Sequence, residues 1–195
     1  MNKSNYRFYK TLVKLLKPIV YLLYRPKFVG KENMDIAGPA IVASNHIHMC
    51  DPAFTIIATP RVIRYMSKKE LNDSILGFVY SNIGTIRVDR QNDGHSSMIE
   101  AEKALNMGEV VGIFPEGTRN RNNPDKLLPF KFGAVKMAKE TGSPIIPIAL
   151  KGKGIPFFSS YRIAIGEPIY ISSSADLEKE NDKLRNTIQD LYDNL

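Results

Sequence analysis

The chain has 195 residues, the length of one globular domain with room for a short additional segment. Apolar residues make up 43% and charged residues 24%, which argues against disorder, and the single cysteine excludes an intrachain disulfide or a zinc site built from several cysteines. The net charge of +7 comes from residues 1–31, which carry eight Lys or Arg and no acid, so the rest is nearly neutral and unlike a nucleic-acid-binding domain.

The segment 1–27 is predicted to be basic, amphipathic and helical, with Pro18 dividing it into two short helices. Leu12, Leu16 and Ile19 mark an apolar stripe. The longest charge-free run has only seven residues, whereas a membrane-spanning helix needs about 20. We therefore do not expect this segment to cross a bilayer.

Two arrangements fit this amphipathic segment. In the first, the helix packs on its own domain by the apolar stripe. In the second, it lies in the interface of an anionic membrane, with its apolar side in the lipid and its lysines near lipid phosphates. The absence of acids and the tyrosines between the lysines favour the membrane.

Beyond the basic segment, short apolar runs alternate with helical patterns, so 28–195 is predicted to be one α/β domain with helices flanking a sheet. The expected strands are 40–44, 61–66, 85–88, 110–114, 144–150, 161–165 and 168–171. The expected helices are 52–58, 70–81, 96–107, 132–140 and 176–193. Because ligands of such sheets bind at the carboxyl ends of strands, side chains that follow the strands are the candidates for chemistry.

The first candidate pair follows the strand 40–44. His46 is the second residue after this strand, and Asp51 precedes Pro52, a residue that favours the first turn of a helix. One interpretation makes Asp51 a helix N-cap and His46 a hydrogen-bonded loop residue. The other makes them a dyad, in which the carboxylate holds one ring nitrogen and leaves the other free as a general base.

Two further polar groups follow predicted strands. Asp89 and Arg90 end the strand 85–88, where a solvated Asp–Arg pair on an edge strand is the simpler interpretation. The strand 110–114 runs into the turn Pro115-Glu116-Gly117-Thr118-Arg119. Its glycine lets backbone N–H groups approach a ligand, and its arginine offers a bidentate fork to phosphate. An ordinary Pro-Glu-Gly turn is the alternative.

Four segments of the chain, taken in sequence order, resemble the four signature blocks of the glycerolipid acyltransferase family. The resemblance is greatest to the bacterial lysophosphatidate acyltransferases of that family. The four blocks are Asn45-His46-x4-Asp51, Gly84-x4-Asp89-Arg90, Phe114-Pro115-Glu116-Gly117-Thr118-Arg119 and Ile146-Pro147-Ile148. The third is nearly diagnostic. His48 and Asn120 stand where the family often has serine, and Cys50 is unusual beside the aspartate. These departures bear on the acceptor and not on the class of reaction.

The resemblance implies a glycerol-3-phosphate acyltransferase-like fold, with a mixed central sheet flanked by helices. It implies transfer of a fatty acyl group from a thioester to the free hydroxyl of a lysophospholipid, most simply lysophosphatidate to phosphatidate. His46 and Asp51 would be catalytic. The implied substrate-binding residues are Lys68, Arg90, Glu116, Gly117, Thr118 and Arg119, with the cations on the phosphate and the Glu116 carboxylate orienting arginines or acceptor.

The same resemblance sets expectations for partners and location. No metal or other cofactor is expected, and acyl-CoA or acyl-carrier protein would be the co-substrate. Since lysophospholipids reside in a bilayer, we expect a monotopic, membrane-associated enzyme on the cytoplasmic face, without nucleic-acid partners.

Three other functions stay open at this point. The acceptor could be glycerol 3-phosphate or another lyso-lipid. A non-catalytic module that binds membrane lipid could have the same fold. The spacing His46-x-His48-x-x-Asp51 also resembles the metal loop of metallo-β-lactamase-like hydrolases, but it is one residue out of step and lacks a third histidine.

Overall fold

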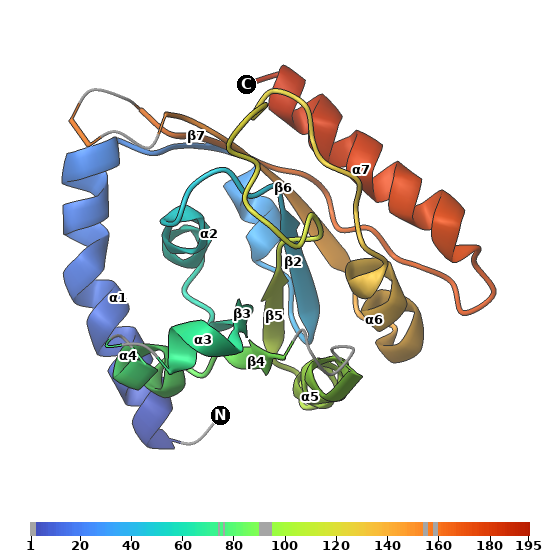
Figure 1. The fold of residues 1–195 in the computed structure, drawn as a ribbon, viewed down its shortest axis with the longest axis horizontal. Coiled ribbons are helices and arrows are strands. Elements are labelled where there is room, and N and C mark those ends of the chain that lie inside the picture. The colour runs from blue at the N-terminus through green and yellow to red at the C-terminus, as the bar shows by residue number, and fades with distance from the viewer. Residues whose placement is uncertain (1–2, 74, 76, 90–94, 154–155, 158–159) are drawn as a thin grey trace.

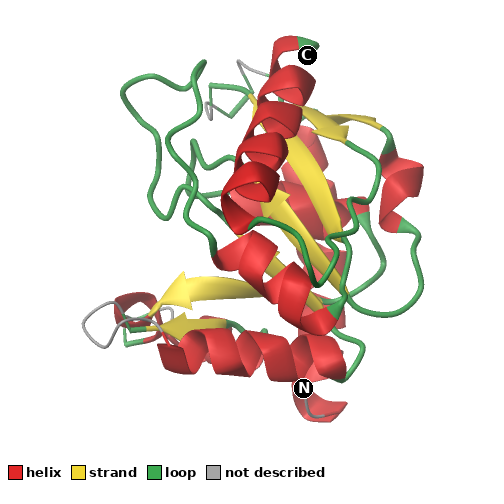
Figure 2. Ribbon diagram, turned by 90° about the vertical axis from the view of Figure 1, so that its right-hand side faces the viewer, coloured by secondary structure: helices red, strands yellow, loops and turns green. Residues whose placement is uncertain are grey.

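A computed structural model describes residues 3–73, 75, 77–89, 95–153, 156–157 and 160–195 of the chain. It contains a seven-stranded sheet with helices on both faces (Figure 1, Figure 2). The strands are β1 (Lys27–Val29), β2 (Ala40–Ser44), β3 (Ile63–Lys68), β4 (Ile86–Val88), β5 (Val110–Ile113), β6 (Ile145–Lys151) and β7 (Arg162–Ile165). The helices are α1 (Lys3–Tyr24), α2 (Asp51–Ala58), α3 (Lys69–Asn72), α4 (Gly77–Asn82), α5 (His95–Asn106), α6 (Gly133–Thr141) and α7 (Leu177–Asp193), with a 3-10 turn η1 (Lys31–Met34).

The sheet is mixed, as the family resemblance implies. Its strand order is β1-β7-β6-β2-β5-β3-β4. The strands β6, β2, β5, β3 and β4 run parallel, so their carboxyl ends lie at one edge of the sheet. Strand β7 pairs antiparallel with β6, and β1 runs parallel to β7. Residues that follow β2, β3, β4 and β5 are therefore brought to the same edge.

Alternation along the central strand β2 explains the two helical layers. Ile41 and Ala43 pack with residues of α5, α6 and α7 on one face, and Ala40 and Val42 pack with residues of α2 and α1 on the other. All four side chains are buried, because a central parallel strand is covered on both faces. The core thus fixes the strand from which His46 emerges.

The N-terminal segment is helical, as predicted, but it is not divided into two helices. Pro18 does not divide it, since α1 is one helix from Lys3 to Tyr24. Pro18 lies on the exposed side, where the hydrogen bond that proline removes can be replaced by water. The helix packs on the body through Tyr9, Val20 and Tyr24, which are buried. Among the described residues, no helix is both long and apolar enough to cross a membrane.

Two other predictions need correction, and one short strand was missed. The expected helix 70–81 is two short helices, α3 and α4. The expected strand 168–171 is reduced to one antiparallel bridge between Ile145 and Ile169, beside a proline that has no N–H to donate. Strand β1 was not predicted, because three residues are too few to show an alternating pattern.

Candidate active site

Asn45 fixes the direction of the chain where it leaves β2. Its side-chain Nδ2 donates to the Leu150 carbonyl at 2.9 Å, and its Oδ1 accepts from the Leu150 N–H at 2.7 Å. Asn45 is fully buried, so its amide continues the pairing between β2 and β6 in place of the backbone. His46 therefore leaves the sheet from a rigid position at the carboxyl edge.

His46 and Asp51 are in direct contact. His46 Nδ1 lies 2.8 Å from Asp51 Oδ2, and the same oxygen accepts from the N–H groups of Ile47 and His48, each at 2.7 Å. The Tyr161 hydroxyl donates to the other carboxylate oxygen at 3.4 Å. Asp51 is fully buried. These donors replace the water that the carboxylate gives up on burial.

The Asp51 side chain points back to the preceding loop and does not cap the helix that follows. Helix α2 begins at Asp51, with Cys50 at the N-cap position, where it makes no side-chain capping bond. Because the ionised carboxylate can only accept, Nδ1 of His46 must donate, and Nε2 is left with a lone pair. The imidazole is 18% exposed, so a substrate can reach it.

Glu116 ties the His46 loop to the turn after β5. Its Oε1 accepts from the His46 N–H at 2.8 Å, and its Oε2 accepts from the Leu128 N–H at 3.0 Å. Asn120 N–H donates to the His46 carbonyl at 2.7 Å. Burial raises the pKa of the Glu116 carboxyl, and its two N–H partners oppose that effect. The backbone of His46 is therefore held at both its N–H and its carbonyl.

A stack of rings supports the imidazole from the sheet side. The Phe114 ring lies on that of His46, with centroids 4.0 Å apart and planes 16° apart. The Tyr65 ring stacks on Phe114 at 5.2 Å, and its hydroxyl contacts Thr55. Gly112 leaves room for the Tyr65 ring, since a Cβ at that position would lie 2.7 Å from ring carbons.

We expect Gly112→Ala to lower the free energy of unfolding by about 1–3 kcal/mol, because overpacking a buried site forces neighbours to move. Thermal or denaturant unfolding measures this cost. If the Tyr65 ring is the obstacle, the double variant with Tyr65→Leu should lose less than the sum of the two single losses. Additive losses would mean that the clash lies elsewhere.

The other expected substrate-binding residues lie around the same edge. Gly117 has a positive φ of 67°, a conformation that favours glycine, and Thr118 and Arg119 follow it as exposed residues. Lys68 is the exposed last residue of β3. Since β2, β3 and β5 are parallel neighbours, these residues share the edge that carries His46. Arg90 lies outside the described residues.

Three contacts near the site were not predicted. A Cβ on Gly117 would lie 2.9 Å from Lys131 Cε, so the Lys131 side chain covers this turn. Tyr161, the residue before β7, donates from its hydroxyl to Asp51. Tyr24, at the end of α1, packs edge-on against Tyr161 and Phe54. No local pattern marks the two tyrosines, since each meets the site only through the fold.

The side chains of His48 and Cys50, in the same loop, contact other partners. His48 Nδ1 accepts from the Cys50 N–H at 3.2 Å, and Cys50 Sγ lies 3.9 Å from the Tyr24 hydroxyl. Within the described ranges, His, Cys, Asp and Glu side chains do not gather in groups of three or more that could hold a metal ion.

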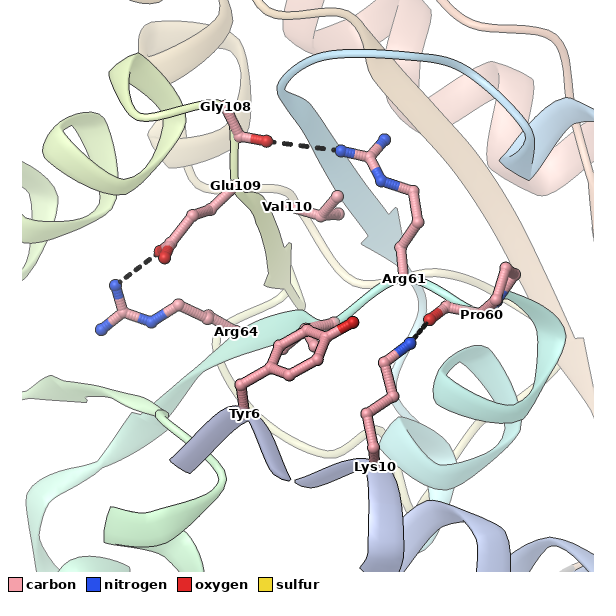
Figure 3. A pocket seen from close by; sticks show the side chains of 9 residues that line it. Tyr6, Lys10, Pro60, Arg61, Arg64, Gly108, Glu109 and Val110 are labelled. Atoms are coloured by element: carbon pink, nitrogen blue, oxygen red, sulfur yellow. Dashed lines mark hydrogen bonds and ion pairs between the residues drawn. The ribbon is translucent and has the colours of Figure 1, made fainter. Parts of the chain in front are cut away.

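A cavity of about 360 Å³ lies at the opposite edge of the sheet, beside the first residues of β3 and β5 (Figure 3). Its cations are bound to the protein itself. Lys10 donates to the Pro60 carbonyl, Arg61 to the carbonyls of Ile36 and Gly108, and Arg64 pairs with Glu109. The cavity lies between α1 and the segments that precede β3 and β5. It is separate from the His46 site.

Comparisons with known proteins identify related sequences. Residues 25–151 match the acyltransferase family. The chain is 34% identical to the 1-acyl-sn-glycerol-3-phosphate acyltransferase of Bacillus subtilis, over 87% of this chain and 86% of the relative. It is 32% identical to the protein of that name from Borreliella burgdorferi, over 78% of this chain and 64% of the relative.

A solved structure supports the fold independently. The crystal structure of the 1-acyl-sn-glycerophosphate acyltransferase of Thermotoga maritima superposes with a TM-score of 0.78 at 20% identity. The match covers 97% of this chain and 82% of that one. This likeness shows the fold. The family match over residues 25–151 and the 34% identity to the Bacillus subtilis relative establish that the chain belongs to the acyltransferase family.

Proposed function

We propose that this acyltransferase transfers a fatty acyl group from a thioester to the free hydroxyl of 1-acyl-sn-glycerol 3-phosphate, with His46 as general base. The observation that carries the proposal is the 2.8 Å contact between His46 Nδ1 and the buried Asp51 carboxylate, at the edge where the parallel strands end. The names of the Bacillus and Borreliella relatives support the choice of acceptor.

In the proposed reaction, Nε2 of His46 takes the proton of the acceptor hydroxyl as its oxygen attacks the thioester carbonyl carbon. The tetrahedral intermediate then expels the thiolate, which takes the proton from the imidazolium. Asp51 stabilises that imidazolium through Nδ1. Because the acceptor attacks directly, Cys50 carries no acyl group, in keeping with its contact with Tyr24.

Cations at the same edge suit a phosphate on the acceptor. Arg119 and Lys68 are exposed there, and Arg90 follows β4 in sequence. Gly117 and Thr118 would offer backbone N–H or hydroxyl groups to the phosphate or to the oxyanion. Glu116 acts as a positioning residue in this proposal, since both its oxygens accept backbone N–H groups, one of them from His46.

We expect Arg119→Ala to raise KM for lysophosphatidate roughly 10- to 100-fold, as for a lost hydrogen bond to a charged group of about 1.5–3 kcal/mol. KM for the thioester should change little. Steady-state kinetics with each substrate varied in turn measures both constants. If a phosphate-free acceptor lost activity to the same extent, Arg119 would not be a phosphate ligand.

The identity of both substrates can be tested directly. Purified protein is incubated with labelled lysophosphatidate, glycerol 3-phosphate or a neutral lyso-lipid, each with acyl-CoA or acyl-carrier protein as donor, and products are resolved by mass spectrometry. The proposal expects phosphatidate without any added cofactor. Faster acylation of glycerol 3-phosphate would mean that the proposed acceptor is wrong but that the protein is still an acyltransferase. Binding without turnover would favour a non-catalytic lipid-binding protein.

Membrane association is part of the proposal. The outer side of α1 leaves large apolar residues exposed, including Leu15 and Leu22, while its other side is bound to the body. A helix of this kind suits a monotopic protein that lies on one leaflet. The cytoplasmic leaflet fits best, because its anionic lipids attract the basic residues of the segment.

A further inference from the structure

One side of α1 carries a continuous apolar stripe. Its members recur at alternating spacings of four and three residues, so they lie on one side of the helix. This α1 stripe consists of Phe8, Leu12, Leu15, Ile19 and Leu22. Leu15 is 63% and Leu22 67% exposed, and Ile19 is also exposed.

The α1 stripe has a fixed direction relative to the body. The buried Tyr9 hydroxyl accepts from the Ile63 N–H at 3.2 Å, and Lys10 donates to the Pro60 carbonyl (Figure 3). At the other end of the helix, Tyr24 is buried against the ring of Phe54. Because both ends of α1 are bound, the helix cannot rotate to cover the stripe.

The apolar surface continues beyond α1 onto the helices α3 and α4, which lie near its amino-terminal half (Figure 1). Phe8 of the stripe meets the Phe78 ring edge-on, with centroids 5.9 Å apart. Phe78 is nevertheless 71% exposed, Ile75 is fully exposed and Leu71 is exposed beside them. We call Leu71, Ile75 and Phe78 the α4 patch. Adjoining apolar side chains of this size at a surface mark an interaction site.

We propose that the α4 patch is a second lipid-contact site, continuous with the α1 stripe and buried in the same anionic bilayer. The inference rests on the membrane association in the proposed function. A bilayer supplies an apolar layer and negative headgroups in a single surface. The protein supplies a complementary surface: the α1 stripe, the α4 patch, and a helix α1 that carries five cations and no acid.

The second contact has a mechanical consequence. A single helix in the interface leaves the protein free to roll about the helix axis. A further contact beside that axis removes this freedom, so the carboxyl edge that carries His46 keeps one orientation toward the lipid. A lysophospholipid whose acyl chain stays in the leaflet would then present its free hydroxyl to the imidazole repeatedly in the same geometry.

Tryptophan fluorescence tests the proposal, since the chain has no tryptophan of its own. The full-length protein carries one reporter at a time: Phe78→Trp in the patch, Leu15→Trp in the stripe, or Tyr170→Trp as a control. Tyr170 is 70% exposed between β7 and α7. Each variant is mixed with phosphatidylglycerol–phosphatidylcholine vesicles with brominated acyl chains. We expect a blue shift and quenching for Phe78→Trp and Leu15→Trp, and neither for Tyr170→Trp.

A loss-of-contact variant gives a second measurement. Phe78→Ser should weaken vesicle partitioning by about tenfold, the scale of one large apolar side chain leaving lipid, whereas Tyr170→Ser should not. Acyl transfer to an acceptor dispersed in detergent should be unchanged by Phe78→Ser, while transfer to an acceptor embedded in vesicles should fall.

The outcomes separate this inference from the proposed function. Quenching of Leu15→Trp without quenching of Phe78→Trp would overturn the α4 patch and leave the α1 contact intact. If neither position were quenched while acyl transfer was preserved, the proposed membrane association would be wrong and the proposed enzymatic activity would stand. A blue shift of Phe78→Trp that grows with protein concentration in the absence of lipid would assign the patch to a second copy of the chain, which also overturns the proposal.

Discussion

His46→Ala is expected to lower kcat by about 10²–10⁴-fold, the usual contribution of a positioned general base. Without the imidazole, the acceptor hydroxyl must attack the thioester while it still holds its proton. The fold should survive, because Asn45 and Glu116 hold this stretch through their own bonds and the His46 side chain is only partly buried. Turnover under saturating substrates, with circular dichroism as a check on folding, measures the effect.

His48→Ala is the matched control. His48 is two residues away in the same loop, and its ring nitrogen accepts one bond from the Cys50 N–H. The backbone N–H that it donates to Asp51 is kept in the alanine variant. Most of the activity should therefore remain. An inactive His48→Ala beside an active His46→Ala would reverse the assignment of the general base.

The second large effect is expected for Asp51→Asn. Two backbone donors, from Ile47 and His48, point at Oδ2, so the amide oxygen and not the NH₂ must occupy that position. Nδ1 of His46 can then still donate, and the imidazole keeps its tautomer. What is lost is the negative charge that stabilises the imidazolium, so we expect kcat to fall by about 10³-fold, the upper range for one preorganised electrostatic contact.

The size of the loss in Asp51→Asn tells two roles apart. Where such a substitution reverses the histidine tautomer, the loss is about 10⁴-fold. A smaller loss, with substrate KM values unchanged, would support the charge as the main contribution. A variant with near-normal kcat would show that Asp51 only holds the conformation of the loop. The general-base proposal would then rest on His46 alone.

The site was predictable where chemistry follows an apolar strand. His46 comes after the run 40–44 and Glu116 after 110–114, and both runs are observed as parallel neighbours, β2 and β5. Alternating burial on two faces makes such central strands nearly all apolar, so their ends are sharp in the sequence.

Contacts between distant segments could not be predicted. Tyr161 reaches Asp51 across 110 residues, and its place depends on β7 turning antiparallel to β6. The role of Glu116 was also hidden, because the sequence indicates an acid in a turn but not that both its oxygens accept backbone N–H groups. The continuous helix through Pro18 depends on which side of α1 the body covers, which only packing decides.

The packing of Tyr24 bears on how a water-soluble form of this enzyme could be engineered. Tyr24 ends α1 and packs against Tyr161 and Phe54, which stack on each other at 3.9 Å beside the Asp51 carboxylate. Truncation of α1 would remove Tyr24 from these two rings and expose them to water beside the Asp51 carboxylate. Under the proposed membrane association, polar substitutions at Leu15 and Leu22 would weaken lipid binding and leave the packing of Tyr24 intact.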